Sequence, residues 1–135
     1  MKVLKIITVL FLTLTLSFCS SDDDSNNGDT NGTLTGTWRL TKETDIEAGE
    51  PDDVYIVPDG CNEIVFVIDS NTIETIEDYN CDGETDGTYT VSYTRSGNTI
   101  TVNGYPAEIT TLNETTLIII EEGIDYSYIS EFERL

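Results

Sequence analysis

Three oxygen-bearing side chains at alternate positions, Asp78, Asn80 and Asp82, precede a glycine and are followed by Glu84. This spacing is that of the first half of a calcium-binding loop, in which several hard oxygen ligands surround one ion and glycine permits a sharp turn. The position where such a loop supplies a bidentate glutamate is occupied by Tyr89. We therefore predict an acidic hairpin loop and keep a calcium site made by those four side chains as the alternative.

Two of the three cysteines, Cys61 and Cys81, lie on either side of two predicted strands that a tight turn at residues 69–71 connects. Antiparallel pairing of these strands brings the two cysteines together at the open end of the hairpin. In an exported chain such a pair oxidises, and closing a loop of this size stabilises a fold by about 3 kcal/mol. We predict a disulfide. A metal held by two thiolates is the alternative, although a chain without histidine offers an incomplete zinc shell.

Catalytic chemistry has few candidates in this chain. Histidine is absent, which removes the usual general base and proton shuttle. The carboxylate pairs Asp52–Asp53 and Glu121–Glu122 could serve acid–base work, but with 26 acidic against 6 basic residues a solvated acidic surface explains them. No nucleophile elbow or phosphate-binding glycine motif occurs. We predict a protein that is not an enzyme and that, at a net charge of -20, does not bind nucleic acid.

The N-terminus has the layout of an export signal. Two lysines in the first five residues precede a mostly apolar run over residues 6–18, which is short for a membrane span. The run ends in Leu-Ser-Phe before Cys19 and resembles the lipobox of bacterial lipoproteins, with Phe18 standing where a small residue is usual. The resemblance implies cleavage of the signal peptide 1–18 and attachment of lipid, palmitate included, at Cys19. A membrane anchor is the alternative.

Residues 19–33 are rich in Ser, Asp, Asn, Gly and Thr and hold no large apolar side chain to bury. This composition predicts a disordered acidic tether. The segment from Ser20 to Asp24 resembles the acidic export signal of Bacteroidetes surface lipoproteins, which implies an outer-membrane lipoprotein, with exposure at the cell surface as one outcome. Several acyl chains on one residue anchor a protein firmly, so even this acidic chain would stay at the membrane.

From Leu34 onward, short runs of alternating apolar and polar residues are separated by turn residues, without helical periodicity. Eight strands are predicted, over residues 36–44, 62–68, 72–79, 88–94, 99–103, 107–112, 115–121 and 125–133. The stretch 45–60 carries Pro51 and Pro58 and is predicted to be a long loop. Eight strands joined by hairpins close into an antiparallel up-and-down barrel, which has no free edges. Residues 34–135 are therefore predicted to form one all-β domain, which we expect to be a monomer.

Several aromatic side chains are predicted to point into this barrel. They are Phe66, Tyr89, Tyr93, Tyr126 and Tyr128. An eight-stranded barrel is just wide enough for its own side chains or for one small ligand. The sequence leaves both outcomes open: these side chains fill the barrel, or they line a site for a ligand.

The only tryptophan, Trp38, stands at the start of the first strand, two residues after Gly36. Together with the order of eight strands and the basic Arg134 near the end of the last strand, this resembles the lipocalin-like domains of Bacteroidetes lipoproteins. In lipocalins such an arginine packs across the tryptophan and closes the bottom of the barrel. The resemblance therefore implies a cation–π stack of Arg134 on Trp38, worth about 0.5–2 kcal/mol. Unlike in typical lipocalins, we expect no helix after the last strand.

The function that this implies is non-catalytic binding of a small, largely apolar ligand at the open end of the barrel. The alternative is a filled barrel that serves as a structural or surface-interaction module, through its acidic loops or an outward face at Ile118 and Ile120. Calcium could stabilise either form, and no other cofactor is expected.

Overall fold

The computed structural model describes residues 30–135, so the predicted signal peptide 1–18, the lipidation site Cys19 and most of the tether lie outside the described residues. Over the described range the chain forms nine β-strands and no helix. The strands are β1 (Gly36–Glu47), β2 (Asp53–Ile56), β3 (Ile64–Ile68), β4 (Thr72–Glu77), β5 (Gly87–Ser96), β6 (Thr99–Val102), β7 (Tyr105–Leu112), β8 (Thr116–Glu122) and β9 (Tyr126–Arg134). This part of the chain accordingly contains no helix long and apolar enough to cross a membrane.

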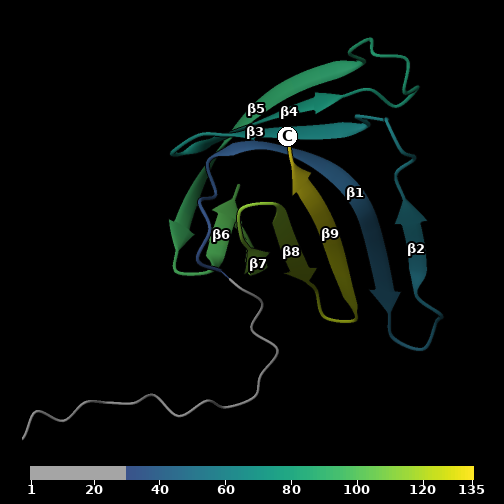
Figure 1. The fold of residues 1–135 in the computed structure, drawn as a ribbon. Coiled ribbons are helices and arrows are strands. Elements are labelled where there is room, and N and C mark those ends of the chain that lie inside the picture. Colours follow the sequence, from purple (N-terminus) through teal and green to yellow (C-terminus); the bar gives the residue numbers. More distant parts are fainter. Residues whose placement is uncertain (1–29) are drawn as a thin grey trace, which may run out of the picture.

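All nine strands belong to one antiparallel sheet, and eight of them close into a barrel (Figure 1). From β3 to β9, strands that are neighbours in the chain pair with each other, while β1 pairs with both β3 and β9. The β1–β9 closure runs from Trp38 opposite Arg134 to Glu47 opposite Tyr126. Because every strand of the ring has two neighbours, the ring leaves no free edge. The predicted eight-stranded antiparallel barrel is confirmed.

The ninth strand, β2, lies within the segment 45–60, for which the prediction of a loop was wrong. β1 is longer than predicted, and its residues 42–45 pair with all four residues of β2. β3 occupies the same edge of β1 only over residues 36–39, so the rest of that edge accepts β2 (Figure 1). Pro51 and Pro58 flank β2 and do not interrupt it, as expected for prolines beside a short edge strand.

One end of the barrel is closed by Arg134. Its guanidinium carbon lies 4.1 Å from the centre of the Trp38 ring, which is a cation–π stack. Its nitrogens donate hydrogen bonds to the backbone carbonyls of Thr33 and Thr35. Gly36 has a φ of +144°, and a Cβ at this position would collide with Nη1 of Arg134. The sequence therefore needs glycine here so that the arginine can reach across the tryptophan.

Large apolar side chains fill the core of the barrel. The largest fully buried ones are Trp38, Leu40, Ile109, Leu112 and Leu117. On β8 the alternation is as predicted: Leu117 and Ile119 are buried, whereas Ile118 and Ile120 on the outer face are only half-buried.

A β-bulge in β1 changes which residues face the barrel interior. Leu40 is buried in the core, and the register of β1 with β9 shifts directly after it. Beyond this bulge Glu43 stands opposite Ser130, and Asp45 stands opposite Tyr128. Because directly opposed residues share a face of the sheet, the bulge turns two carboxylates toward the side that Ser130 faces.

Candidate ligand-binding site

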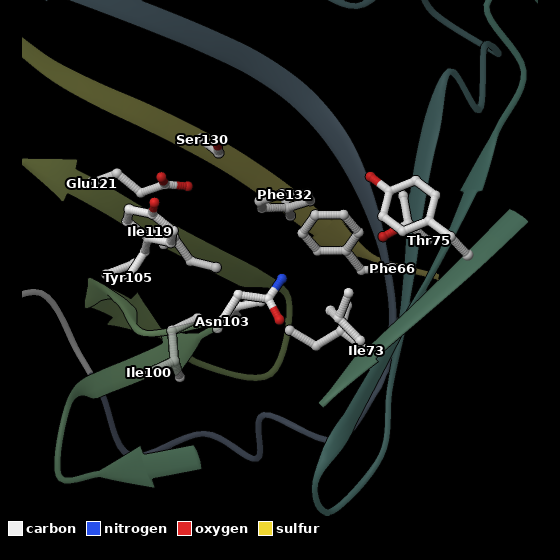
Figure 2. A pocket seen from close by; sticks show the side chains of 14 residues that line it. Phe66, Ile73, Thr75, Ile100, Asn103, Tyr105, Ile119, Glu121, Ser130 and Phe132 are labelled. Carbon is white, nitrogen blue, oxygen red and sulfur yellow. The ribbon is translucent and has the colours of Figure 1, made fainter. Parts of the chain in front are cut away.

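A cavity of about 370 Å³ lies inside the barrel, lined by side chains from β3 to β9 (Figure 2). Its apolar lining consists of Phe66, Ile73, Val91, Ile100, Val102, Ala107, Ile119 and Phe132. Its lining residues with polar side-chain groups are Thr75, Tyr89, Asn103, Tyr105, Glu121 and Ser130. The barrel is therefore hollow beside its packed core.

Solvent exposure divides this cavity into a floor and a mouth. The floor includes Ile73, Ile100 and Phe132, which are 5%, 3% and 3% exposed. The mouth includes Tyr89 and Tyr105, which are 50% and 76% exposed. A ligand could thus bury an apolar body against the floor while its polar groups meet hydroxyl, amide and carboxylate groups at the mouth.

Strand register explains why residues of the cavity lining from different strands meet. Phe66 on β3 stands opposite Thr75 on β4, which stands opposite Tyr89 on β5. Directly opposed residues of neighbouring strands share one face of the sheet, here the inner face. The ring of Phe66 also contacts the ring of Phe132 on β9, with centroids 4.8 Å apart. This pair spans the width of β1 and forms one wall of the cavity (Figure 2).

The structure brings together only part of the predicted aromatic set. Phe66 and Tyr89 line the cavity. Tyr93 is buried at 6% exposure outside the lining, and its hydroxyl donates a 2.8 Å hydrogen bond to the carbonyl of Asp69. Tyr126, at the beginning of β9, is 54% exposed and is not part of the lining. Tyr93 therefore holds a turn in place and does not contact the cavity.

Tyr128, the fifth aromatic residue of that set, lies among three carboxylates next to the cavity. It stands opposite Glu121 on β8 and opposite Asp45 on β1. Burial raises the pKa of its hydroxyl above the ordinary tyrosine value, and a hydrogen bond to Glu43 together with the charges of Glu43, Asp45 and Glu121 raises this pKa further. Tyr128 is therefore a neutral hydrogen-bond donor in a region of negative potential.

Sequence reasoning missed the polar part of the lining. The sequence predicts Glu121 to be part of a solvated acidic pair, and it gives no prediction for Ser130, Asn103 and Tyr105. Strand alternation could have identified Glu121, because it shares the inner face of β8 with Ile119. Tyr105 begins β7, Asn103 lies in the turn between β6 and β7, and Ser130 lies within β9. Nothing about these residue types at these positions predicts that they line a cavity.

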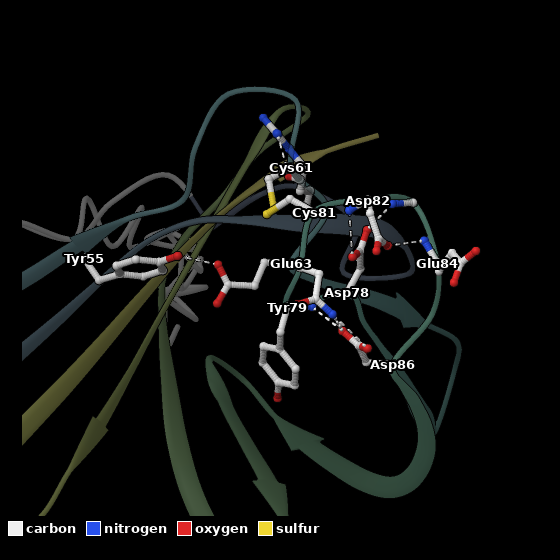
Figure 3. The surroundings of a disulfide bond; sticks show 12 residues. Tyr55, Cys61, Glu63, Asp78, Tyr79, Cys81, Asp82, Glu84 and Asp86 are labelled. Carbon is white, nitrogen blue, oxygen red and sulfur yellow. Dashed lines mark hydrogen bonds between the residues drawn. A yellow bond between two sulfur atoms is a disulfide. The ribbon is translucent and has the colours of Figure 1, made fainter.

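Cys61 and Cys81 form the predicted disulfide, with their Cα atoms 4.9 Å apart (Figure 3). It connects the segment before β3 to the loop after β4, at the open end of that hairpin. Cys61 is 3% exposed, and its carbonyl accepts a 3.0 Å hydrogen bond from Nη1 of Arg39. The bridge therefore fixes the β4–β5 loop to a well-anchored point of the barrel.

The acidic β4–β5 loop is organised by its own hydrogen bonds (Figure 3). The carboxylate of Asp78 accepts from the backbone N–H groups of Asp82 and of the glycine after it, at 3.2 and 2.8 Å. Asp86 accepts from the side chain of Asn80, and the backbone N–H of Glu84 donates to Asp82. Within residues 30–135 no group of three or more acidic, cysteine or histidine side chains is arranged to hold a metal. Calcium binding here stays a prediction.

An eight-stranded up-and-down barrel with a Trp–Arg stack and an internal cavity defines the class of lipocalin-like proteins, and two solved structures share the fold. A lipocalin-like protein from Bacteroides uniformis superposes with a TM-score of 0.54 at 15% identity, covering 76% of this chain and 98% of that one. An uncharacterized protein from Bacteroides eggerthii gives a TM-score of 0.53 at 10% identity, covering 76% of this chain and 100% of that one.

A family model of the lipocalin-like domain matches residues 34–119, which is more than half of the chain. The chain therefore belongs to the lipocalin-like domain family, and the resemblance noted in the sequence is confirmed. No curated protein matches the sequence.

Proposed function

We propose that the protein is a non-catalytic binding protein whose barrel takes up a small, largely apolar ligand. The cavity is the observation that supports this function. Its volume of about 370 Å³ falls within the range of about 300–1,000 Å³ typical of small-molecule sites, and its floor is apolar with few polar groups at the mouth. Protein interiors are otherwise close-packed, so a cavity of this size reduces packing contacts that a ligand would restore.

The proposal of a binding protein, not an enzyme, rests on the chemistry of the lining. Glu121 is the one carboxylate among the described residues that line the cavity, and the hydroxyl groups there have no histidine to activate them. Nucleophilic or acid–base catalysis needs a reactive group and a partner that sets its protonation. The carboxylate of Glu121, beside the hydroxyl and amide groups of the lining, suits recognition of a polar group on a ligand.

We further propose that the barrel works at the outer membrane as a lipoprotein, anchored through Cys19 and held off the surface by the tether 19–33. The support is the sequence of the leader and of the acidic segment that follows it. Intact mass measurement of the protein from the membrane fraction should give a chain that begins at Cys19 and carries acyl groups. A Cys19→Ala variant that remains equally membrane-bound would contradict the anchor.

The binding function is tested with protein purified from its own host. Native mass spectrometry followed by organic extraction should find a compound of fixed mass that travels with the folded chain. The proposal would be contradicted if the protein purified from its host carries no bound compound and also binds no small apolar alcohol, such as phenylbutanol, in calorimetry.

A surface-interaction role is the second candidate, and β2 is the feature that favours it. Val54, Tyr55 and Ile56 are 48%, 44% and 68% exposed. On its far side β2 pairs with no strand of the described residues. Exposed apolar edge strands commonly add to sheets of other chains. We expect the chain to be a monomer in the binding role. Concentration-dependent association of the chain with itself that Ile56→Lys abolishes would show that β2 makes contacts between chains, and would favour this second role.

A further inference from the structure

Negative charge gathers at the mouth of the cavity. Glu121 lines the cavity and is exposed to solvent at the mouth. Beyond the bulge in β1, Glu43 and Asp45 are half-buried and stand opposite Ser130 and Tyr128 of β9. The two carboxylates of β1 therefore add to the charge of Glu121 on the side of the cavity that β8 and β9 form.

The positive side chains of the described barrel all have partners elsewhere. Arg39 and Lys42 form ion pairs with carboxylates of β9. Arg95 donates a hydrogen bond to a carbonyl of the β5–β6 turn, and Arg134 stacks on tryptophan at the closed end. None of the four is among the residues that line the cavity. Within the described residues, no cation is therefore positioned to neutralise an anionic ligand.

We propose that the ligand, if the binding function above holds, is an amphiphile with an apolar body and a cationic amine head, and that Glu121 recognises this head. The apolar body would pack on Phe66, Ile73 and Phe132 at the floor. An ammonium group carries three donors and no acceptor, which suits the carboxylate of Glu121 and the hydroxyl of Ser130. Both groups lie on one side of the cavity in Figure 2.

Electrostatics favour an amine over the other common head groups. An ammonium beside a carboxylate makes a charge-assisted hydrogen bond, which is about twice as strong as a neutral one. A ligand carboxylate at the same place would be repelled by three acidic side chains and would lose water without gaining a cationic partner. The net charge of -20 acts in the same direction, because it concentrates cations near the protein and repels anions.

The proposal is tested with three probes that share one apolar body and differ in head group: phenylbutylamine, phenylbutanol and phenylbutyrate. Their affinities for the full chain are measured by calorimetry at neutral pH and moderate salt. The amine should bind about twofold to fivefold more tightly than the alcohol, as expected for an ion pair at a partly exposed site. The acid should bind more weakly than the alcohol.

Two variants locate the effect. In Glu121→Gln the ratio of amine to alcohol affinity, both measured in that variant, should fall close to one. Glu114→Gln is the matched control, because it removes the same charge from the exposed turn before β8. Within β8, the extended chain from Thr116 to Glu121 alone spans about 17 Å, well beyond the screening length of about 8 Å at physiological salt. This control should keep the amine preference of the native chain.

The outcomes separate this inference from the binding function on which it rests. If the alcohol binds but the three probes agree within about twofold, or the acid binds best, the amine preference is wrong and the binding function stands. If the preference persists in Glu121→Gln, Glu121 does not recognise the head group. If none of the probes binds, both proposals are contradicted.

Discussion

Loss of the Cys61–Cys81 bridge should cost the barrel about 3 kcal/mol of unfolding free energy. The two cysteines are 20 residues apart. In the chain-entropy relation, closing a loop of that length lowers the entropy of the unfolded chain by roughly 11 cal/mol/K, which corresponds to about 3 kcal/mol at room temperature. For a domain of about a hundred residues, each kcal/mol shifts Tm by about 4–8 °C, so Tm should fall by roughly 12–24 °C.

The bridge can be removed in two ways that differ in one respect. Reduction breaks the S–S bond and leaves both sulfur atoms in place, whereas Cys61→Ala combined with Cys81→Ala also removes a buried sulfur, since Cys61 is 3% exposed. Urea unfolding of the oxidised, reduced and doubly substituted proteins gives the free energy of unfolding of each. The reduced protein should lose about 3 kcal/mol, and the variant should lose at least as much because its core also loses packing contacts.

A loss below about 1 kcal/mol in the reduced protein would refute this reasoning. It would mean that the unfolded chain is already restricted in this region, or that the hydrogen bonds of the β4–β5 loop hold it to the hairpin without the cross-link.

Three further predictions concern the closed end and the acidic side of the barrel. Gly36→Ala should destabilise more than Gly49→Ala in urea unfolding, because both glycines have positive φ but only a Cβ at Gly36 meets Arg134; equal losses would contradict the steric account. Arg134→Leu should lower the free energy of unfolding by about 1–2 kcal/mol through loss of the stack on Trp38, and an unchanged value would show that the stack contributes nothing. The folded-state pKa of Tyr128 is raised above the unfolded value of about 10. The contribution of Tyr128 to stability is therefore complete below about pH 10 and is lost as the pH rises above 10. Tyr128→Phe should therefore make the alkaline fall in stability less steep, and an equally steep fall would contradict the raised pKa.

The barrel was predictable because its pattern is local. Alternation along β8 predicts that Leu117 and Ile119 point inward, and both are buried. Antiparallel pairing of a hairpin predicts that Cys61 and Cys81 lie together, and they form a disulfide. β2 was not predictable in the same way. It is four residues long, it lies between prolines, and it exists because β3 leaves part of one edge of β1 unpaired. That is a tertiary reason, which strand propensity does not contain.

The cavity and its charge depend on features that a linear pattern does not record. Whether an eight-stranded barrel is full or hollow follows from how its inward side chains fit together, and not from their types alone. Simple alternation from Leu40 would place Glu43 and Asp45 on the outer face of β1. The bulge after Leu40 reverses that assignment, so the acidic side of the barrel became visible only with the observed register.

The claim that the barrel cavity holds a ligand is tested most directly by blocking it. Val91 lines the cavity, whereas its neighbour Thr90 is exposed on the outer face of β5, so Val91→Trp places an indole in the cavity and Thr90→Trp places the same group outside it. Calorimetric titration of the native chain and both variants with phenylbutanol is the measurement. We expect saturable binding by the native chain and by Thr90→Trp, and none by a folded Val91→Trp. Binding by Val91→Trp equal to that of the native chain, or no binding by the native chain itself, would contradict the claim.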